Sequence, residues 1–280
     1  MTWVINRERT LNIAHRGARS LAPENTLAAA RKALEAGADM WELDVCMTRD
    51  GELIVIHDAT LERTSDAREA FPLRRPWRVH EFTMEEVLRL DFGSWFIEQD
   101  PFGQISSGAV SKSEAAGYAG EPAPLLSEAL AFTRDHDWAV NIEIKDLSGT
   151  PGDASIVEKV VDLVEDMGML DRVHVSSFNQ DYIRRVRLRN PGLSVGVLRS
   201  RRHRNPTALL ARLGVRVYHP RIGIITIRDI EHFRDDGIDV LVWVVNDEET
   251  MCELTAARVS GIFTDFPLTL ARVRGGEKQR

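Results

Sequence analysis

Polar side chains interrupt one otherwise apolar stretch, residues 41–58, which reads "WELDVCMTRDGELIVIHD". Glu42, Asp44 and His57 stand there among residues that are typical of buried strands. Because side chains alternate between the two faces of a strand, Glu42 and Asp44 share one face. Carboxylates can hold a cation, and an imidazole can move a proton near neutral pH. The stretch therefore indicates a chemical site.

The same stretch contains a turn. Only "TRDGE" separates its two apolar halves, whereas a parallel crossover needs a dozen or more residues. Asp50–Gly51 is a strong signal for a two-residue hairpin loop, and that register places His57 opposite Asp44. Opposed side chains have Cβ atoms about 4.5–5.5 Å apart. We therefore predict a β-hairpin arm over about 41–57 that brings the three polar groups together.

Strand-like runs alternate with helical patterns along the rest of the chain, which is typical of parallel strands joined by helices. With 53–57 assigned to the arm, eight strands remain, at 11–15, 40–45, 138–144, 172–178, 193–198, 215–220, 239–245 and 261–267. Eight parallel strands predict an α/β fold, the (β/α)8 TIM barrel.

The alternation stops between Asp58 and Pro124, over a segment too long for an ordinary connection. We predict an insertion subregion over about 59–124, covering the C-terminal face of the barrel. The 280 residues fit one large domain, so we expect a single domain over 1–280. The tail "RVRGGEKQR" (272–280) is expected to be frayed.

Carboxylates gather where neighbouring predicted strands end, which is where TIM-barrel enzymes keep their functional groups. Glu42 and Asp44 belong to the second strand, and Glu143 belongs to the third. Carboxylates this close cannot all stay ionised without a counter-charge. Because all three ligands offer oxygen, we predict one divalent cation, Mg²⁺ or Ca²⁺, on this site.

Basic and titratable groups stand at the same strand ends. His15 and His57 have the ordinary pKa for general acid and base work near neutral pH. Arg16 and Lys145 add positive charge. Each group alone could be structural, as a buried histidine or as an ion-pair partner. Together with a metal site they predict chemistry on a phosphate ester.

Several motifs, in order along nearly the whole chain, resemble the glycerophosphodiester phosphodiesterase family: "AHRG" (14–17), "PENT" (23–26), "ELDV" (42–45), "DGELIVIHD" (50–58), "LERTS" (61–65), "EIK" (143–145), "VWVVN" (242–246) and "GIFTDFP" (261–267). The resemblance implies a TIM barrel with a small insertion and one divalent cation on Glu42, Asp44 and Glu143. It also implies that His15 and His57 are the acid–base pair. Arg16 and Lys145 would contact the phosphate.

Three further residues match family positions near the substrate. Glu24 of "PENT" is a candidate substrate contact, or a carboxylate that favours the start of a helix. Trp243 matches a substrate-facing aromatic residue, or is part of the core. Phe178 is similar, and we assign it to the core.

The expected reaction is metal-dependent hydrolysis of a glycerophosphodiester to sn-glycerol 3-phosphate and an alcohol. One alternative is lysophospholipase D-type cleavage of a lysophospholipid, in which Trp95, Phe96 and Phe102 would contact an acyl chain. These aromatic residues are otherwise the insertion's own small core. A second alternative, from another class, is a barrel that binds phosphodiesters without turnover.

The charge and hydropathy of the chain limit the kinds of molecule that it can bind. The formal charge of −7 gives no general affinity for nucleic acid, so we read "RSRRHR" (199–204) as a solvated loop or an anion contact for the substrate head group. No apolar run is long enough for stable membrane insertion, and the start of the chain lacks the pattern of a signal peptide. We therefore expect a cytoplasmic enzyme acting on a small-molecule phosphodiester.

Overall fold

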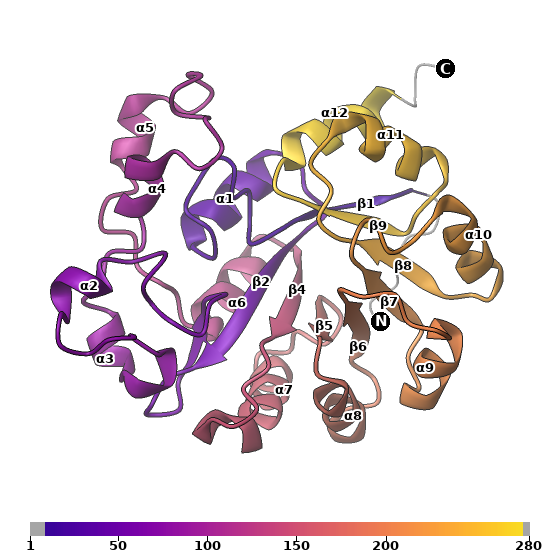
Figure 1. The fold of residues 1–280 in the computed structure, drawn as a ribbon, viewed down its shortest axis with the longest axis horizontal. Coiled ribbons are helices and arrows are strands. Elements are labelled where there is room, and N and C mark those ends of the chain that lie inside the picture. Colours follow the sequence, from indigo (N-terminus) through magenta and orange to yellow (C-terminus); the bar gives the residue numbers. More distant parts are fainter. Residues whose placement is uncertain (1–8, 277–280) are drawn as a thin grey trace.

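Eight parallel strands form a closed barrel in the computed structural model, which describes residues 9–276 (Figure 1). The strands are β1 (Leu11–Ala14), β2 (Met40–Met47), β4 (Ala139–Ile144), β5 (Val173–Ser177), β6 (Ser194–Arg199), β7 (Val217–Pro220), β8 (Asp239–Val242) and β9 (Gly261–Thr264). Each pairs with the next, and β9 pairs with β1 to complete the ring. The predicted (β/α)8 TIM barrel is confirmed.

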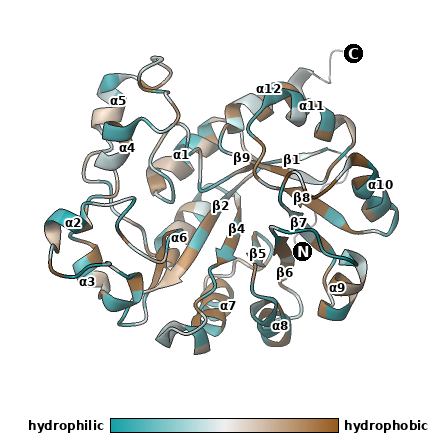
Figure 2. Ribbon diagram, in the orientation of Figure 1, coloured by the Kyte–Doolittle hydropathy of each residue, from teal (hydrophilic) through white to brown (hydrophobic). Residues whose placement is uncertain are grey.

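Helices follow the barrel strands and surround them: α1 (Leu27–Glu35), α6 (Leu126–Asp135), α7 (Ile156–Asp166), α8 (Gln180–Arg189), α9 (Pro206–Leu213), α10 (Ile227–Asp235), α11 (Glu248–Ala256) and α12 (Pro267–Gly276). Figure 2 shows hydrophobic strands inside a ring of helices that carry both polar and apolar residues. The predicted frayed tail is wrong for 272–276, which belong to α12. Residues 277–280 lie outside the described part.

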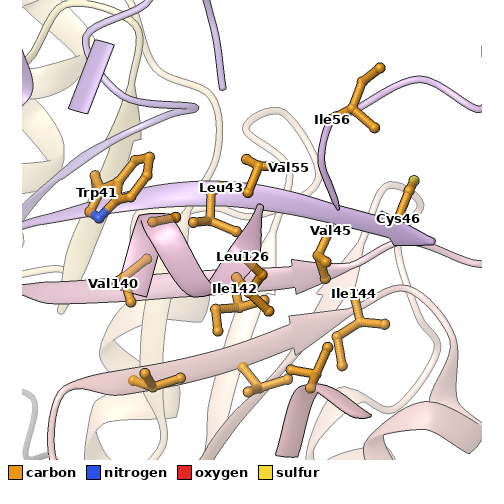
Figure 3. Close-up of a cluster of buried hydrophobic side chains, with 14 of the residues drawn as sticks. Trp41, Leu43, Val45, Cys46, Val55, Ile56, Leu126, Val140, Ile142 and Ile144 are labelled. Carbon is orange, nitrogen blue, oxygen red and sulfur yellow. The ribbon is translucent and has the colours of Figure 1, made fainter. Parts of the chain in front are cut away.

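The main core lies between the strands and the helices that cover them. Trp41, Leu43 and Val45 alternate with the polar positions of β2, and all three are fully buried. Figure 3 shows them beside Ile142 of β4 and Leu126 of α6. Because the apolar side chains take this face, the intervening Glu42 and Asp44 face the barrel interior.

The arm is present, since β3 (Leu53–Val55) pairs antiparallel with the end of β2. Cys46 lies opposite Ile54, one residue away from the predicted register. The loop spans 49–51, because Gly51 adopts a left-handed φ of +84° and lengthens the turn by a residue. The predicted two-residue loop is therefore wrong.

This register changes how His57 reaches the site. The amide of Ile56, not a group of His57, is bonded to the carbonyl of Asp44, at 2.9 Å. In a continuous strand, a shift of one residue would turn His57 to the opposite face. β3 ends at Val55, however, and the chain bends at His57. The imidazole therefore still lines the same cavity as Glu42.

The predicted insertion contains α2 (Ala67–Ala70), the 3-10 helix η1 (Val79–Glu81), α3 (Met84–Val87), α4 (Ser94–Gln99) and α5 (Lys112–Ala116). It flanks the barrel beside α1 and α6 (Figure 1). Trp95 and Phe96 are buried against the alanines of α1, so their interpretation as core is confirmed. The ring of Phe102 instead contacts Phe266 at the barrel rim, 5.5 Å between centroids. Between residues 9 and 276, no helix has the length and apolar character needed to cross a membrane.

Candidate active site

A cavity of about 260 Å³ opens at the carboxyl ends of the barrel strands. Predicted site residues form its charged side: His15, Arg16, Glu42, His57, Glu143 and Lys145. Trp243 also lines the cavity, together with Phe178, Leu198, Val244 and Phe263. These five residues are here called the apolar wall.

The three predicted metal ligands are neighbours. Glu42, Asp44 and Glu143 are buried, and each offers a carboxylate oxygen within 4.8 Å of the others. Lys145 donates to Glu143 at 2.7 Å and to Asp44 at 3.3 Å. Asn25 donates to the other carboxylate oxygen of Asp44 at 2.9 Å. The lysine and the amide therefore hold Asp44 and Glu143 in place.

Burial, mutual repulsion and the neighbouring cations shift the pKa values of these three carboxyl groups in different directions. Burial, together with the charges of Asp44 and Glu143, raises the pKa of Glu42 well above its ordinary value. Burial and Asp44 also raise the pKa of Glu143, although Lys145 opposes the shift. Burial would raise the pKa of Asp44 too, but Lys145 and Arg16 hold it low. A cation placed among these oxygens would relieve the repulsion, so the donor set fits a hard divalent metal ion.

Arg16 is fixed from several directions. Its backbone amide donates to Glu42 at 2.8 Å, and one guanidinium nitrogen donates to Glu24 at 2.8 Å. Its Nε lies 3.2 Å from a carboxylate oxygen of Asp44. Burial disfavours the guanidinium charge, but the carboxylates of Asp44 and Glu24 more than compensate and raise the pKa of Arg16. The charged guanidinium group of Arg16 is thus held at the edge of the cavity.

Glu24 lies behind Arg16 and does not line the cavity. It accepts hydrogen bonds from Arg16 at 2.8 Å and from Arg63 at 2.6 Å, and Arg19 lies 3.1 Å away. Burial would raise the pKa of Glu24, but Arg16 and the other guanidinium groups lower it to about 2. Glu24 therefore helps to fix the position of Arg16, and its contact with a substrate stays a prediction.

His15 has a carboxylate partner that the sequence interpretation missed. Its Nδ1 lies 2.7 Å from Asp265, which directly follows β9. Asn246 donates to the other oxygen of Asp265 at 2.7 Å and accepts from its amide at 2.9 Å. Burial and the charge of Arg16 lower the pKa of His15, and Asp265 opposes that shift. The only sequence signal was an aspartate at a strand end, in "GIFTDFP".

His57 also has a carboxylate partner. Its Nδ1 lies 2.5 Å from Asp58, whose other oxygen accepts from Arg63 at 2.6 Å. Burial would raise the pKa of Asp58, but the bonds from His57 and Arg63 lower it. Because both histidines use Nδ1 for an aspartate, Nε2 of each remains for proton exchange with a bound molecule.

Two aromatic side chains of the apolar wall form an edge-to-face pair. The rings of Trp243 and Phe178 lie 5.5 Å apart at 89°. The indole of Trp243 donates to the carbonyl of His219 at 2.8 Å, which fixes its orientation. Phe178 is 37% exposed, so its assignment to the core is wrong. It follows the last residue of β5 and lies beyond the packed interior of the barrel.

Comparisons with known proteins agree with this geometry. The glycerophosphodiester phosphodiesterase of Caldanaerobacter subterraneus is 36% identical over 270 residues, covering 96% of this chain and 100% of that protein. A glycerophosphodiester phosphodiesterase structure from Agrobacterium tumefaciens is 26% identical, with a TM-score of 0.70 and coverage of 97% and 100%. A phosphodiesterase from Oleispira antarctica, solved with the product sn-glycerol 3-phosphate, shares the fold at 23% identity and a TM-score of 0.76, with coverage of 93% and 95%. The glycerophosphoryl diester phosphodiesterase family matches residues 15–269, and the chain therefore belongs to this family of phosphoric diester hydrolases.

Proposed function

We propose that the protein hydrolyses glycerophosphodiesters to sn-glycerol 3-phosphate and an alcohol, with the help of one divalent cation. The observation that carries this proposal is the single cavity that gathers an acidic cluster, two basic side chains and two histidines with aspartate partners. The bound product in the Oleispira antarctica structure supports the identity of the phosphate product.

Glu42, Asp44 and Glu143 would hold the cation. Their three oxygen donors and the raised pKa values of Glu42 and Glu143 fit Mg²⁺ or Ca²⁺. Such an ion, when bound, supplies positive charge for the non-bridging oxygens of a phosphodiester. Lys145 donates hydrogen bonds to two of these carboxylates, Asp44 and Glu143. Its contact with the phosphate would therefore lie next to the cation site.

Arg16 and Lys145 orient the phosphate. Both line the cavity, and both are held by buried carboxylates in positions that need little rearrangement on binding. A preorganised cation stabilises negative charge as it builds up on the phosphate in the transition state. Glu24 contributes by holding Arg16.

The two histidines transfer protons at Nε2. One takes the proton from the attacking hydroxyl, and the other gives a proton to the alkoxide that leaves. The attacking group is either water or the substrate's own glycerol 2-hydroxyl, which would form a cyclic phosphate that water opens. Asp265 and Asp58 position the two rings and stabilise their protonated forms.

The first test measures release of glycerol 3-phosphate from glycerophosphocholine and glycerophosphoglycerol, and release of lysophosphatidic acid, which keeps the acyl chain, from a lysophospholipid. The protein is stripped with chelator and assayed alone, with Mg²⁺ and with Ca²⁺. We expect metal-restored release from the water-soluble diesters. Turnover of the lysophospholipid alone would favour the lysophospholipase D reaction, and full activity after metal removal would contradict the role of the acidic cluster.

A leaving-group test assigns the two histidines. Glycerophospho-p-nitrophenol releases a phenolate that needs no protonation, so it bypasses the general acid. We expect this substrate to restore turnover in only one of the variants His15→Ala and His57→Ala. The histidine removed in that variant is then the general acid, and the other is the general base. Restoration in both variants, or in neither, would contradict the proposal that one ring is the acid and the other the base.

A further inference from the structure

We propose that the preferred substrate carries an anionic group on its alcohol moiety, and that a cluster of arginines beside the cavity binds it. This inference rests on the proposed function and specifies its substrate class. The cluster, here called the arginine rim, extends from the end of β6 through the β6–α9 connection, and from the β7–α10 connection into the first turn of α10. It consists of Arg199, Arg201, Arg202, Arg204, Arg221 and Arg228.

The arginine rim begins where the apolar wall ends. Leu198 lines the cavity, and the next residue is Arg199. The amide of Arg221 donates to the carbonyl of Arg199 at 2.9 Å, and Arg221 forms an isolated bridge with Trp243 of the wall. The two arginine-bearing connections therefore continue the wall outward toward solvent.

The rim also lies across the barrel from the groups proposed to hold the phosphate. The ring runs β1, β2, β4, β5, β6, β7, β8, β9, so β6 stands four places from β1, and β7 four places from β2. Arg16 follows β1, whereas Arg199 ends β6. A diester with its phosphate at Arg16 thus has one ester arm that can cross the apolar wall and end at the rim.

The charges of the rim are largely uncompensated. Within the described residues, only Arg202 of the six has a carboxylate partner, Asp229 at 3.4 Å. Arg201, Arg204, Arg221 and Arg228 are exposed. By contrast, Arg16 and Arg63 are each held by carboxylates. Like charges that cluster without partners repel one another, so they do not contribute to the stability of the fold. An anionic ligand would relieve this repulsion, which favours a binding role for the arginines.

Acidic residues near the β8–α11 connection favour the opposite hypothesis, a cationic head group. Asp247 precedes α11, and Glu248 and Glu249 are its first two residues, close in sequence to Val244 of the apolar wall. The aromatic pair of Trp243 and Phe178 could attract a quaternary ammonium group. The side chain of Asp247, however, accepts the amide of Thr250 at 2.8 Å and caps the helix. The arginines outnumber the remaining acids, so we favour the anionic head group.

The experiment compares three diesters whose alcohol carries a positive, zero or negative charge: glycerophosphocholine, glycerophosphoglycerol and 1,3-bis(sn-glycero-3-phospho)glycerol. We expect kcat/KM to rise with negative charge, with a difference of roughly tenfold between the extremes at low ionic strength. In 1 M salt the Debye length falls to about 3 Å, and the preference should disappear.

Two double variants locate the effect. The first double variant, Arg201→Glu with Arg204→Glu, reverses two charges on the rim. The control, Arg187→Glu with Arg216→Glu, makes the same change in net charge elsewhere. Its two residues lie beside a shallow cavity at the opposite end of β6 and β7. We expect the rim variant to lose the preference for the anionic diester, through a higher KM for that substrate. The Arg187/Arg216 variant should keep the preference, and its kcat on glycerophosphoglycerol should stay within about twofold of the unmodified protein.

The outcomes separate this inference from the proposed function. No turnover of any diester would overturn the proposed function itself. Turnover with no charge preference, with a preference for glycerophosphocholine, or with an equal loss in both double variants would overturn the anionic head group while leaving the hydrolysis intact.

Discussion

At the scale of single residues, the two proposed proton-transfer groups share one arrangement but differ in environment. The side chain of His15 is 14% exposed and rests on Asp265, which Asn246 holds. The side chain of His57 is 32% exposed and rests on Asp58. Orientation by a carboxylate favours one tautomer, so Nε2 is the nitrogen left for proton transfer in both cases.

Removing either imidazole should slow the reaction. We expect His15→Ala and His57→Ala each to lower kcat by about 10²–10⁴ in the metal-loaded protein. His232→Ala is the control, because that histidine is exposed on α10. Steady-state release of glycerol 3-phosphate measures the effect. A near-normal rate in either variant would remove that histidine from the mechanism.

Asp265→Asn tests the support of His15. Asp265 raises the pKa of His15 through its charge and its hydrogen bond, so the variant should lower that pKa further. We expect kcat to fall by roughly ten- to a thousandfold, and the limb of the pH–rate profile that belongs to His15 to move to lower pH. An unchanged pH profile with lower activity would indicate a purely structural role for Asp265.

At the scale of elements, the β1–α1 connection must place Arg16 against the carboxylates. Gly17 follows Arg16 with a φ of +79°. A Cβ at this glycine would lie 2.6 Å from the backbone of Ala29 in α1. The turn can therefore approach the helix only because residue 17 lacks a side chain.

Gly17→Ala should combine backbone strain with a clash. We expect a loss of about 2–4 kcal/mol in the free energy of unfolding, and lower activity because Arg16 moves. Gly168→Ala is the matched control, since Gly168 has a φ of +67° and open space around it. That variant should lose only about 1 kcal/mol. Denaturant unfolding measures both, and equal losses would exclude the clash.

At the scale of the whole molecule, the barrel interior contains a histidine pair. His174 and His219 are fully buried, with their Nε2 atoms 3.0 Å apart. Nδ1 of His174 lies 2.8 Å from the hydroxyl of Ser194. Burial lowers the pKa of His174 to about 3, and burial with the neighbouring His174 lowers that of His219. Both rings are therefore neutral in the folded barrel at neutral pH.

This pair should make the barrel acid-sensitive. The folded state binds fewer protons than the unfolded chain, so the contribution to stability is complete above pH 6.5 and declines as pH falls toward 3. His174 should contribute a slope of about 1.4 kcal/mol per pH unit in that window, and His219 should add to it in the same direction. Unfolding free energies of the unmodified protein, His219→Asn and the control His232→Asn measure the slope. An identical pH dependence in all three would contradict the assignment.

The local pattern of the sequence determined the barrel and much of its chemistry. Eight strands separated by helices were readable because strand and helix periods depend on neighbouring residues. The pairs Glu42 with Asp44, and Glu143 with Lys145, were readable for the same reason, since residues two apart share a strand face. Short motifs over most of the chain were enough to identify the family.

Only the tertiary structure decided how distant segments meet. Closure of the barrel brings Asp265 to His15, which lies 250 positions earlier in the chain, and brings the arginine rim to Trp243. The hairpin register depended on one extra residue in its turn, and the exposure of Phe178 depended on where β5 stops. Such contacts arise from packing between remote elements, and no local period in the sequence encodes them.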